Sequence, residues 1–173
     1  MAIELSSAGV TVQWAAETEA GVMPTSGYTK INGIKSTPDL NPETDSLEVT
    51  DLSDTEWTRY IGGLKDVGGD MAFGANNSEQ FQTDWQELVD TYADNAAEGL
   101  GMWFAIVVPG LKNAFYVSVV PQPLGLSAIE VSSVLEIDAY ASPKLIAGWN
   151  PKPTELCNNS IGLRIEKAAI ARC

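Results

Sequence analysis

The sequence predicts a mainly β protein, an antiparallel β-sandwich or open barrel with one α-helix packed against it. Residues 70–77, 102–108, 114–120 and 128–140 are apolar or alternating runs of strand length, separated by glycine and proline. Apolar residues recur with the 3.6-residue period of an α-helix clearly only from about residue 78 to residue 98. The chain of 173 residues is 45% hydrophobic, which suits one domain with a substantial core.

The two ends of the chain differ in composition from the middle. Residues 1–27 are rich in Ala, Ser, Thr and Gly, with Pro24 and Gly27 as breaks, and we predict an irregular N-terminal arm. The β domain is predicted over residues 28–149, and it begins with a strand at 28–36 followed by a proline-containing loop. Residues 150–173 are mildly basic and are predicted to be a C-terminal extension that forms a short helix or strand.

Residues 47–68 fit no single regular element. The segment begins with strand-like alternation, but neither period 2 nor period 3.6 fits the whole run. Trp57 and Tyr60 stand among several carboxylates, and the pair Gly62-Gly63 interrupts the segment. We therefore expect a long loop that carries exposed apolar side chains, which are a liability in a monomer.

The helix of about 78–98 has a capping signal and an apolar stripe. Asn77 is placed to cap it, with Gln80 as the capping-box partner. Spacings of three and four residues put five apolar side chains on one face. These are Phe81, Trp85, Leu88, Tyr92 and Ala96. The stripe predicts a helix packed on a sheet, with Met71, Phe73 and Ala75 of the preceding strand facing the core.

The later strands predict a hairpin and one strand with a polar face. The runs "MWFAIVV" and "AFYVSVV" flank the turn "PGLKN". In the run 128–140, one face is apolar and is predicted to belong to the core: Val131, Leu135, Ile137 and Ala139. The other face is polar and negative: Glu130, Ser132, Glu136 and Asp138.

The net charge of -13 argues against binding nucleic acid through phosphates, which needs a basic patch. The charge is unevenly distributed. Residues 1–98 carry 18 acidic and 4 basic side chains, a net of -14, whereas residues 99–173 carry 5 acidic and 6 basic, a net of +1. Such asymmetry suits head-to-tail association, in which unlike faces meet.

Catalytic motifs are scarce. The chain has no histidine, so Ser-His and Cys-His nucleophile pairs are impossible. The run "GLKDVGG" lacks the P-loop spacing, and no EF-hand spacing occurs, although a pair of carboxylates would suffice for a glycosidase. We expect no enzyme and no cofactor. No signal peptide or membrane span is apparent, so a cytoplasmic site of synthesis is expected.

The residues from Tyr28 to Phe73 resemble the N-terminal half of the tail tube (major tail) proteins of long-tailed, non-contractile bacteriophages. That family has a strand of the type "I-x-G-I-K/T-x-x-P-D", then "E-x-x-D-V-T-x-L-x-D", a tyrosine and a "G-L-K-D" step. The matching positions are Ile31, Gly33, Ile34, Lys35, Pro38, Asp39, Glu48, Val49, Thr50, Leu52, Asp54, Tyr60, Gly63, Leu64, Lys65 and Asp66. The resemblance continues through the helix and later strands to Trp149, whereas both ends of the chain depart from it.

The resemblance implies the phage tail tube fold and a structural role in the virion tail, after assembly in the host cytoplasm. Six copies would form a ring whose inner sheets join into one barrel, and stacked rings would conduct double-stranded DNA. The implied partners are further copies of the chain, the tape measure protein and other tail proteins, with no membrane and no sequence-specific DNA binding.

The same resemblance implies that the loop 47–68 reaches the next ring and becomes ordered there. Its candidate interface residues are Leu47, Val49, Trp57, Tyr60, Ile61 and Leu64. The alternative is a lid folded back on the chain's own core.

Two further site predictions concern the channel and the cysteines. In a closed barrel the polar face of Glu130, Ser132, Glu136 and Asp138 would look into the channel or onto a neighbouring layer. A negative channel wall would keep DNA from sticking. Cys157 and Cys173 are predicted either to stay reduced in the cytoplasm or to form a disulfide after release.

Two other functions remain alternatives. A monomeric carbohydrate-binding β-sandwich would use exposed aromatic side chains such as Trp57 or Trp149. Another ring-forming virion component, such as a tail terminator, would share the fold.

Overall fold

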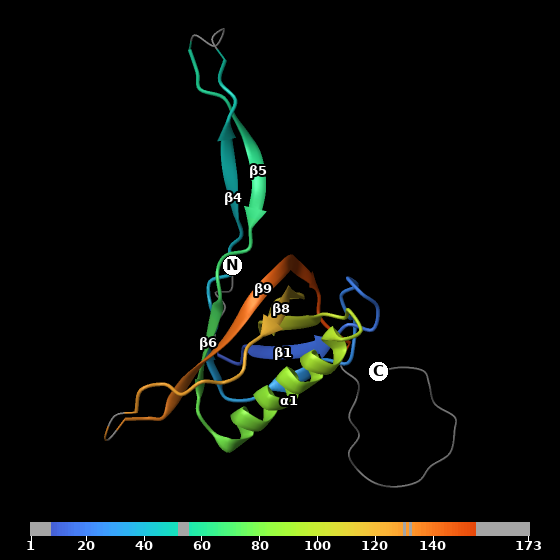
Figure 1. Cartoon of the computed structure of the whole chain (residues 1–173), viewed down its shortest axis with the longest axis vertical. Helices are drawn as coiled ribbons and strands as arrows, with labels where there is room; N and C mark the ends of the chain where they lie inside the picture. Colours follow the sequence, from blue (N-terminus) through green and yellow to red (C-terminus); the bar gives the residue numbers. More distant parts are fainter. Residues whose placement is uncertain (1–7, 52–55, 130, 132, 155–173) are drawn as a thin grey trace.

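The computed structural model describes residues 8–51, 56–129, 131 and 133–154. Within them the chain forms one seven-stranded antiparallel sheet, a separate two-stranded sheet and one helix (Figure 1). The elements are β1 (Thr11–Ala16), β2 (Thr29–Ile31), β3 (Ile34–Ser36), β4 (Glu43–Glu48), β5 (Tyr60–Asp66), β6 (Met71–Asn76), α1 (Glu79–Ala96), β7 (Met102–Val107), β8 (Asn113–Pro121) and β9 (Glu136–Pro151). The predicted fold class is confirmed.

The large sheet curls into a nearly closed barrel because of its connectivity. Its strand order is β2-β1-β7-β8-β9-β6-β3, so the two edge strands are consecutive in the chain. Only Asn32 and Gly33 separate them, and Gly33 has a φ of +85°, which glycine adopts without strain. The carbonyl of Gly33 accepts a hydrogen bond from the backbone N–H of Asn76 at 3.0 Å. The short connection therefore holds the two edges of the sheet close together.

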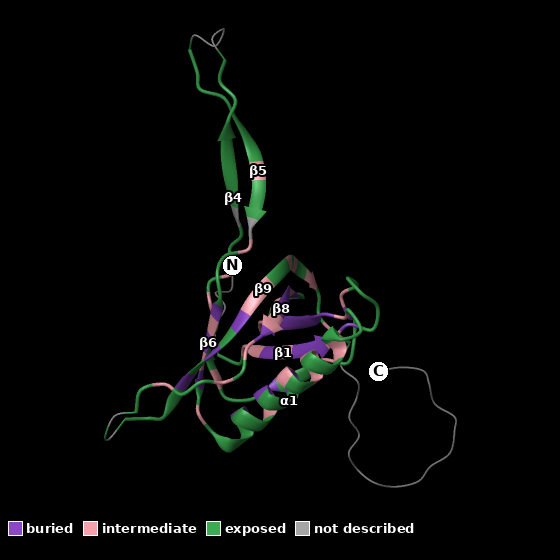
Figure 2. Ribbon diagram, viewed as in Figure 1, coloured by how far each residue is buried: buried purple, intermediate pink, exposed green. Residues whose placement is uncertain are grey.

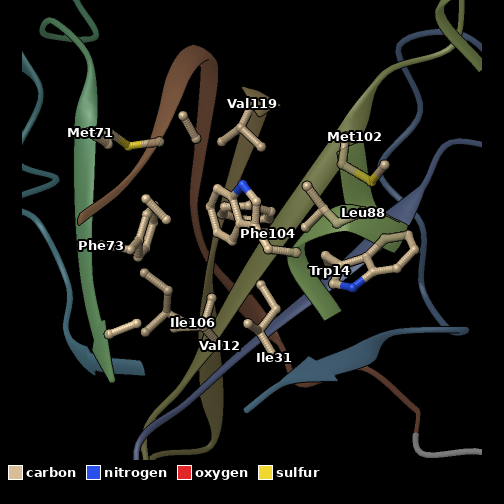
Figure 3. Packing of buried hydrophobic residues seen from close by; sticks show 14 of the residues in the cluster. Val12, Trp14, Ile31, Met71, Phe73, Leu88, Met102, Phe104, Ile106 and Val119 are labelled. Atoms are coloured by element: carbon tan, nitrogen blue, oxygen red, sulfur yellow. The ribbon is translucent and has the colours of Figure 1, made fainter. Parts of the chain in front are cut away.

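The main core lies between the barrel strands and α1 (Figure 3). Met71, Phe73 and Ala75 of β6 are buried, as the alternation of that strand predicts. The rings of Phe73 and Phe104 pack edge to face at 5.4 Å, and Trp85 of α1 contacts both of them. This aromatic cluster fixes the helix on the sheet.

The helix confirms the predicted stripe from Phe81 to Leu88 and corrects its cap, whereas Tyr92 is only partly buried and Ala96 is exposed. Phe81, Trp85 and Leu88 are buried. The cap is Ser78 rather than Asn77, since the Ser78 side chain accepts the N–H of Phe81 at 3.2 Å. A serine one position later satisfies the free N–H groups equally well.

The prediction of an irregular N-terminal arm over residues 1–27 is wrong for residues 11–16. These residues form β1, which pairs with both β2 and β7. The sequence of β1 lacks a clear strand pattern because the neighbours Trp14 and Ala15 are both buried, so apolar and polar residues do not alternate cleanly. Ala15 lies opposite Trp103 in the sheet register. Trp103 belongs to a second small cluster with Ala105, Ala114 and Tyr116, against which Met23 and Tyr28 pack.

Three other boundaries differ from the predictions. The strand expected at 28–36 is split at Asn32 into β2 and β3, because these belong to opposite edges of the sheet. The apolar face expected in 128–140 holds only from Ile137 onward, since Val131 is 97% exposed and β9 begins at Glu136. Strand β9 continues to Pro151, past the predicted domain boundary at 149, because it pairs with β8 to its end.

Candidate assembly interface

The segment predicted as a long loop is largely a β-hairpin that projects from the barrel (Figure 1). Strands β4 and β5 pair only with each other, with Leu47 opposite Ile61 and Glu48 opposite Tyr60. The pairing extends beyond β4, because the N–H of Val49 donates to the carbonyl of Arg59 at 2.9 Å. The prediction of a loop over 47–68 is therefore wrong where the segment belongs to β4 and β5. Backbone hydrogen bonds between the two strands form a hairpin although the side-chain pattern is irregular.

The hairpin carries exposed apolar side chains on both faces. Directly paired residues share a face of a sheet, so Leu47 and Ile61 lie together, and Val49 follows two residues after Leu47. Glu48 and Tyr60 lie on the opposite face. The register shifts between Thr44 and Ser46, which marks a β-bulge in the middle of the hairpin.

Gly63 lies in close contact with the facing strand at this bulge. A Cβ at this position would lie 3.1 Å from the carbonyl oxygen of Asp45 and 3.3 Å from Cγ of Leu47. The glycine therefore allows Leu47 to lie close over the backbone of β5.

All six predicted interface residues are exposed (Figure 2). Trp57 is 81% exposed and Leu64 is 86% exposed. This exposure does not fit a lid folded on the chain's own core. We call these six residues the hairpin patch: Leu47, Val49, Trp57, Tyr60, Ile61 and Leu64.

The hairpin is also strongly acidic. Residues 39–70 contain nine acidic and two basic side chains, a net of -7. Arg59 stabilises the part of the hairpin far from the barrel. Its side-chain Nη2 lies 3.3 Å from Oδ2 of Asp51, and its backbone N–H donates a hydrogen bond to Oγ1 of Thr50 at 3.0 Å. The Arg59–Asp51 pair is exposed, so its contribution to stability is below about 1 kcal/mol.

A second group of exposed apolar side chains lies in the connection between β8 and β9. We call it the β8–β9 patch: Leu126, Ile129, Val131 and Val134. Sequence reasoning missed it because it assigned Val131 to the core face of a strand. The prolines at 121 and 123, Gly125 and the serines at 127, 132 and 133 are the signals of an irregular connection that could have identified it.

Two of the four residues predicted to form a polar face, Glu136 and Asp138, lie in β9 and do form one. Glu136 and Asp138 are exposed, whereas Ile137 and Ala139 between and after them are buried. Lys35 of β3 forms an ion pair with Glu136. The remaining two candidates, Glu130 and Ser132, lie outside the described residues, as do Cys157 and Cys173.

The barrel contains one buried carboxylate that is fully hydrogen-bonded. Glu17 accepts hydrogen bonds from the N–H of Gly101 at 2.8 Å, from Nε1 of Trp103 at 2.7 Å and from the N–H of Gly21 at 3.0 Å. Burial alone would raise the pKa of Glu17, but these hydrogen bonds and the charge of Lys144 lower it below its ordinary value. This network ties the 17–21 turn to the start of β7, so its role is structural.

The described part of the chain offers little for metal or membrane chemistry. No cluster of three or more Cys, Asp or Glu side chains that could hold a metal ion is found in it. Among the same residues, α1 is not long and apolar enough to cross a membrane.

Comparisons with known proteins support the fold. No protein-family model matches the sequence, and no curated protein matches it. The structure is similar to a chain in the cryo-EM structure of the anti-feeding prophage (AFP) baseplate, 6-fold symmetrised. The TM-score is 0.56 at 8% sequence identity, and the match covers 84% of this chain and 95% of that chain. At this identity the similarity establishes a shared fold.

Proposed function

We propose that the chain is a structural virion protein that polymerises as stacked hexameric rings into a tail tube, the conduit for double-stranded DNA. The observation that carries this proposal is the hairpin patch, exposed on a hairpin that extends away from the barrel. A soluble monomer gains nothing from holding an indole and several aliphatic side chains in water. A neighbouring copy that covers them would gain the free energy of apolar burial, about 25 cal/mol per Å².

Two other observations support the same proposal. The fold is shared with a chain of a six-fold symmetrised prophage baseplate, an assembly of many subunits. The net charge of -13 suits a wall along which DNA slides without binding, because a basic wall would release counterions and trap the polyanion. The role is non-enzymatic and needs no cofactor. In this proposal the tape measure protein occupies the tube before DNA does.

A baseplate or tail-terminator ring is the second candidate, and the similarity to the prophage baseplate favours it. A tube protein stacks indefinitely, whereas these components form one or a few rings. The hairpin patch supports stacking, since an apolar surface beyond the barrel needs a partner outside the ring.

Negative-stain microscopy of the purified chain distinguishes these functions. The tail tube proposal predicts tubes of uniform width with a central channel. Single rings would favour the baseplate or terminator role. Monomers that bind glycans would instead support a carbohydrate-binding β-sandwich.

A further inference from the structure

The hairpin patch and the β8–β9 patch project from the barrel in different directions. Figure 1 shows the hairpin extending from the top of the barrel and the β8–β9 connection extending from its lower left. Leu126 is 78% exposed, Val134 is 70% exposed and Val131 is almost fully exposed. The two patches of one copy therefore do not cover each other, and each needs a partner from elsewhere.

We propose that the hairpin patch of one copy docks on the β8–β9 patch of a second copy in the next ring. This inference rests on the proposed function and adds the receiving surface to it. Because the two patches are different surfaces, the contact is heterologous. Each copy inserts its hairpin on one side and receives a hairpin on the other, so the contact repeats along the tube.

Charge selects this pairing over a pairing of two hairpins. Residues 39–70 have a net charge of -7, so two hairpins packed face to face would bring like charges together. Residues 122–135 contain a single charged side chain, Glu130. The β8–β9 connection can therefore accept the acidic hairpin with little repulsion.

The area of the two patches fits a specific contact. A partner that covers both faces of the hairpin, Tyr60 included, meets roughly 1,300 Å² from the ten exposed residues, taking about 150–250 Å² for an aromatic side chain and less for an aliphatic one. Specific interfaces bury roughly 1,200–2,000 Å² in total. Either patch alone would reach only about half of that range.

The experiment uses two variants of the full chain and one control. The hairpin variant carries Trp57→Ser, Ile61→Ser and Leu64→Ser. The connection variant carries Leu126→Ser, Val131→Ser and Val134→Ser. The control is Val22→Ser, a comparably exposed apolar residue outside both patches. Particle mass is measured by analytical ultracentrifugation for each variant alone and for an equimolar mixture of the first two.

The expected result is that wild type and control form tubes, whereas each variant alone stops at short particles. The mixture should give particles of about twice that mass and no longer ones, because one intact hairpin patch meets one intact β8–β9 patch. A connection variant that forms normal tubes would overturn the inference and leave the proposed function standing. A mixture that stays at the starting mass would also overturn it. A wild type that never assembles would overturn both.

A cross-link keeps the test decisive if the connection variant does not fold. The pair Ile61→Cys and Val131→Cys is placed in a chain carrying Cys157→Ser and Cys173→Ser. Oxidation should give disulfide-linked oligomers on a denaturing gel, and the matched pair Val22→Cys and Val131→Cys should give none. Equal cross-linking of both pairs, or none in the first, would contradict the contact.

Discussion

The barrel and the hairpin use apolar residues in opposite ways. In the barrel and its packed helix α1, Phe73, Trp85 and Phe104 are completely buried against one another. In the hairpin, Trp57, Ile61 and their neighbours are as apolar but remain in water. The barrel therefore supplies the stability of the monomer, and the hairpin contributes almost nothing to it. From this difference we expect that the stability of the fold and the proposed assembly can be changed separately.

A core truncation should have the largest effect on monomer stability. Phe73→Ala should lower the free energy of unfolding by about 3–5 kcal/mol, because it leaves a cavity between β6 and α1. Ile61→Ala in the hairpin should change it by less than about 0.5 kcal/mol. Chemical denaturation compares both, in the Trp57→Ala/Tyr60→Ala background so that assembly adds no stability. Similar losses for the two substitutions would break the distinction between the regions.

The Glu17 network should have the next largest effect. Glu17→Gln should cost about 1–3 kcal/mol, since an amide cannot accept from all the donors around it and leaves a buried N–H unpaired. Glu19→Gln is the matched control, because Glu19 is exposed. Thermal unfolding at neutral pH measures both variants. Equal melting temperatures for Glu17→Gln and wild type would contradict this role.

The stabilisation that Glu17 provides should decrease as the pH falls. The pKa of Glu17 is lowered in the folded chain, so its stabilising contribution is present above the ordinary value of 4.5. It is lost as the pH falls through the lowered pKa. The stability difference between wild type and Glu17→Gln should therefore shrink below pH 4.5 in denaturation curves recorded across that range. A difference that grows in acid would show that Glu17 is not stabilised as the carboxylate.

The polar face of β9 should affect stability least. Glu136→Lys with Asp138→Lys reverses two exposed charges and places a second ammonium where a carboxylate now pairs with Lys35. That ion pair is exposed and contributes at most about 1 kcal/mol, so the barrel and the tubes should still form. If this face lines the channel, DNA ejection should slow, most strongly at low salt, where screening is weakest. The control reverses Glu87 and Asp90, two exposed carboxylates of α1. Ejection slowed equally by both charge reversals, or by neither, would place the channel wall elsewhere.

The fold class and the main core were predictable from sequence where side chains follow one clear period. The stripe from Phe81 to Leu88 and the alternation of β6 are such cases, and both are confirmed. Strand β1 was not predictable, because Trp14 and Ala15 are both buried and the strand does not alternate cleanly. The hydrogen-bond network of Glu17, which directly follows this strand, was equally hidden from sequence reasoning. That network depends on contacts between residues 17 and 101–103, which no local pattern reveals.

The exposed apolar residues of the hairpin were predictable as a set, but their structure was not. Trp57 and Leu64 stand out because they are apolar side chains in an acidic segment. Their arrangement depends on the register of β4 with β5 and on the bulge at Gly63, which backbone hydrogen bonds determine. The β8–β9 patch was missed because alternation alone cannot show that Val131 leaves the sheet.

The most direct test of the central claim is negative-stain imaging of wild type beside the double variant Trp57→Ala/Tyr60→Ala, with thermal unfolding of both. The exposed hairpin predicts that wild type forms tubes, that the double variant does not, and that circular dichroism shows the same fold in both. Burial of two aromatic side chains in each contact, repeated around a ring, supplies the free energy that the variant loses. Normal tubes from the double variant would contradict the account.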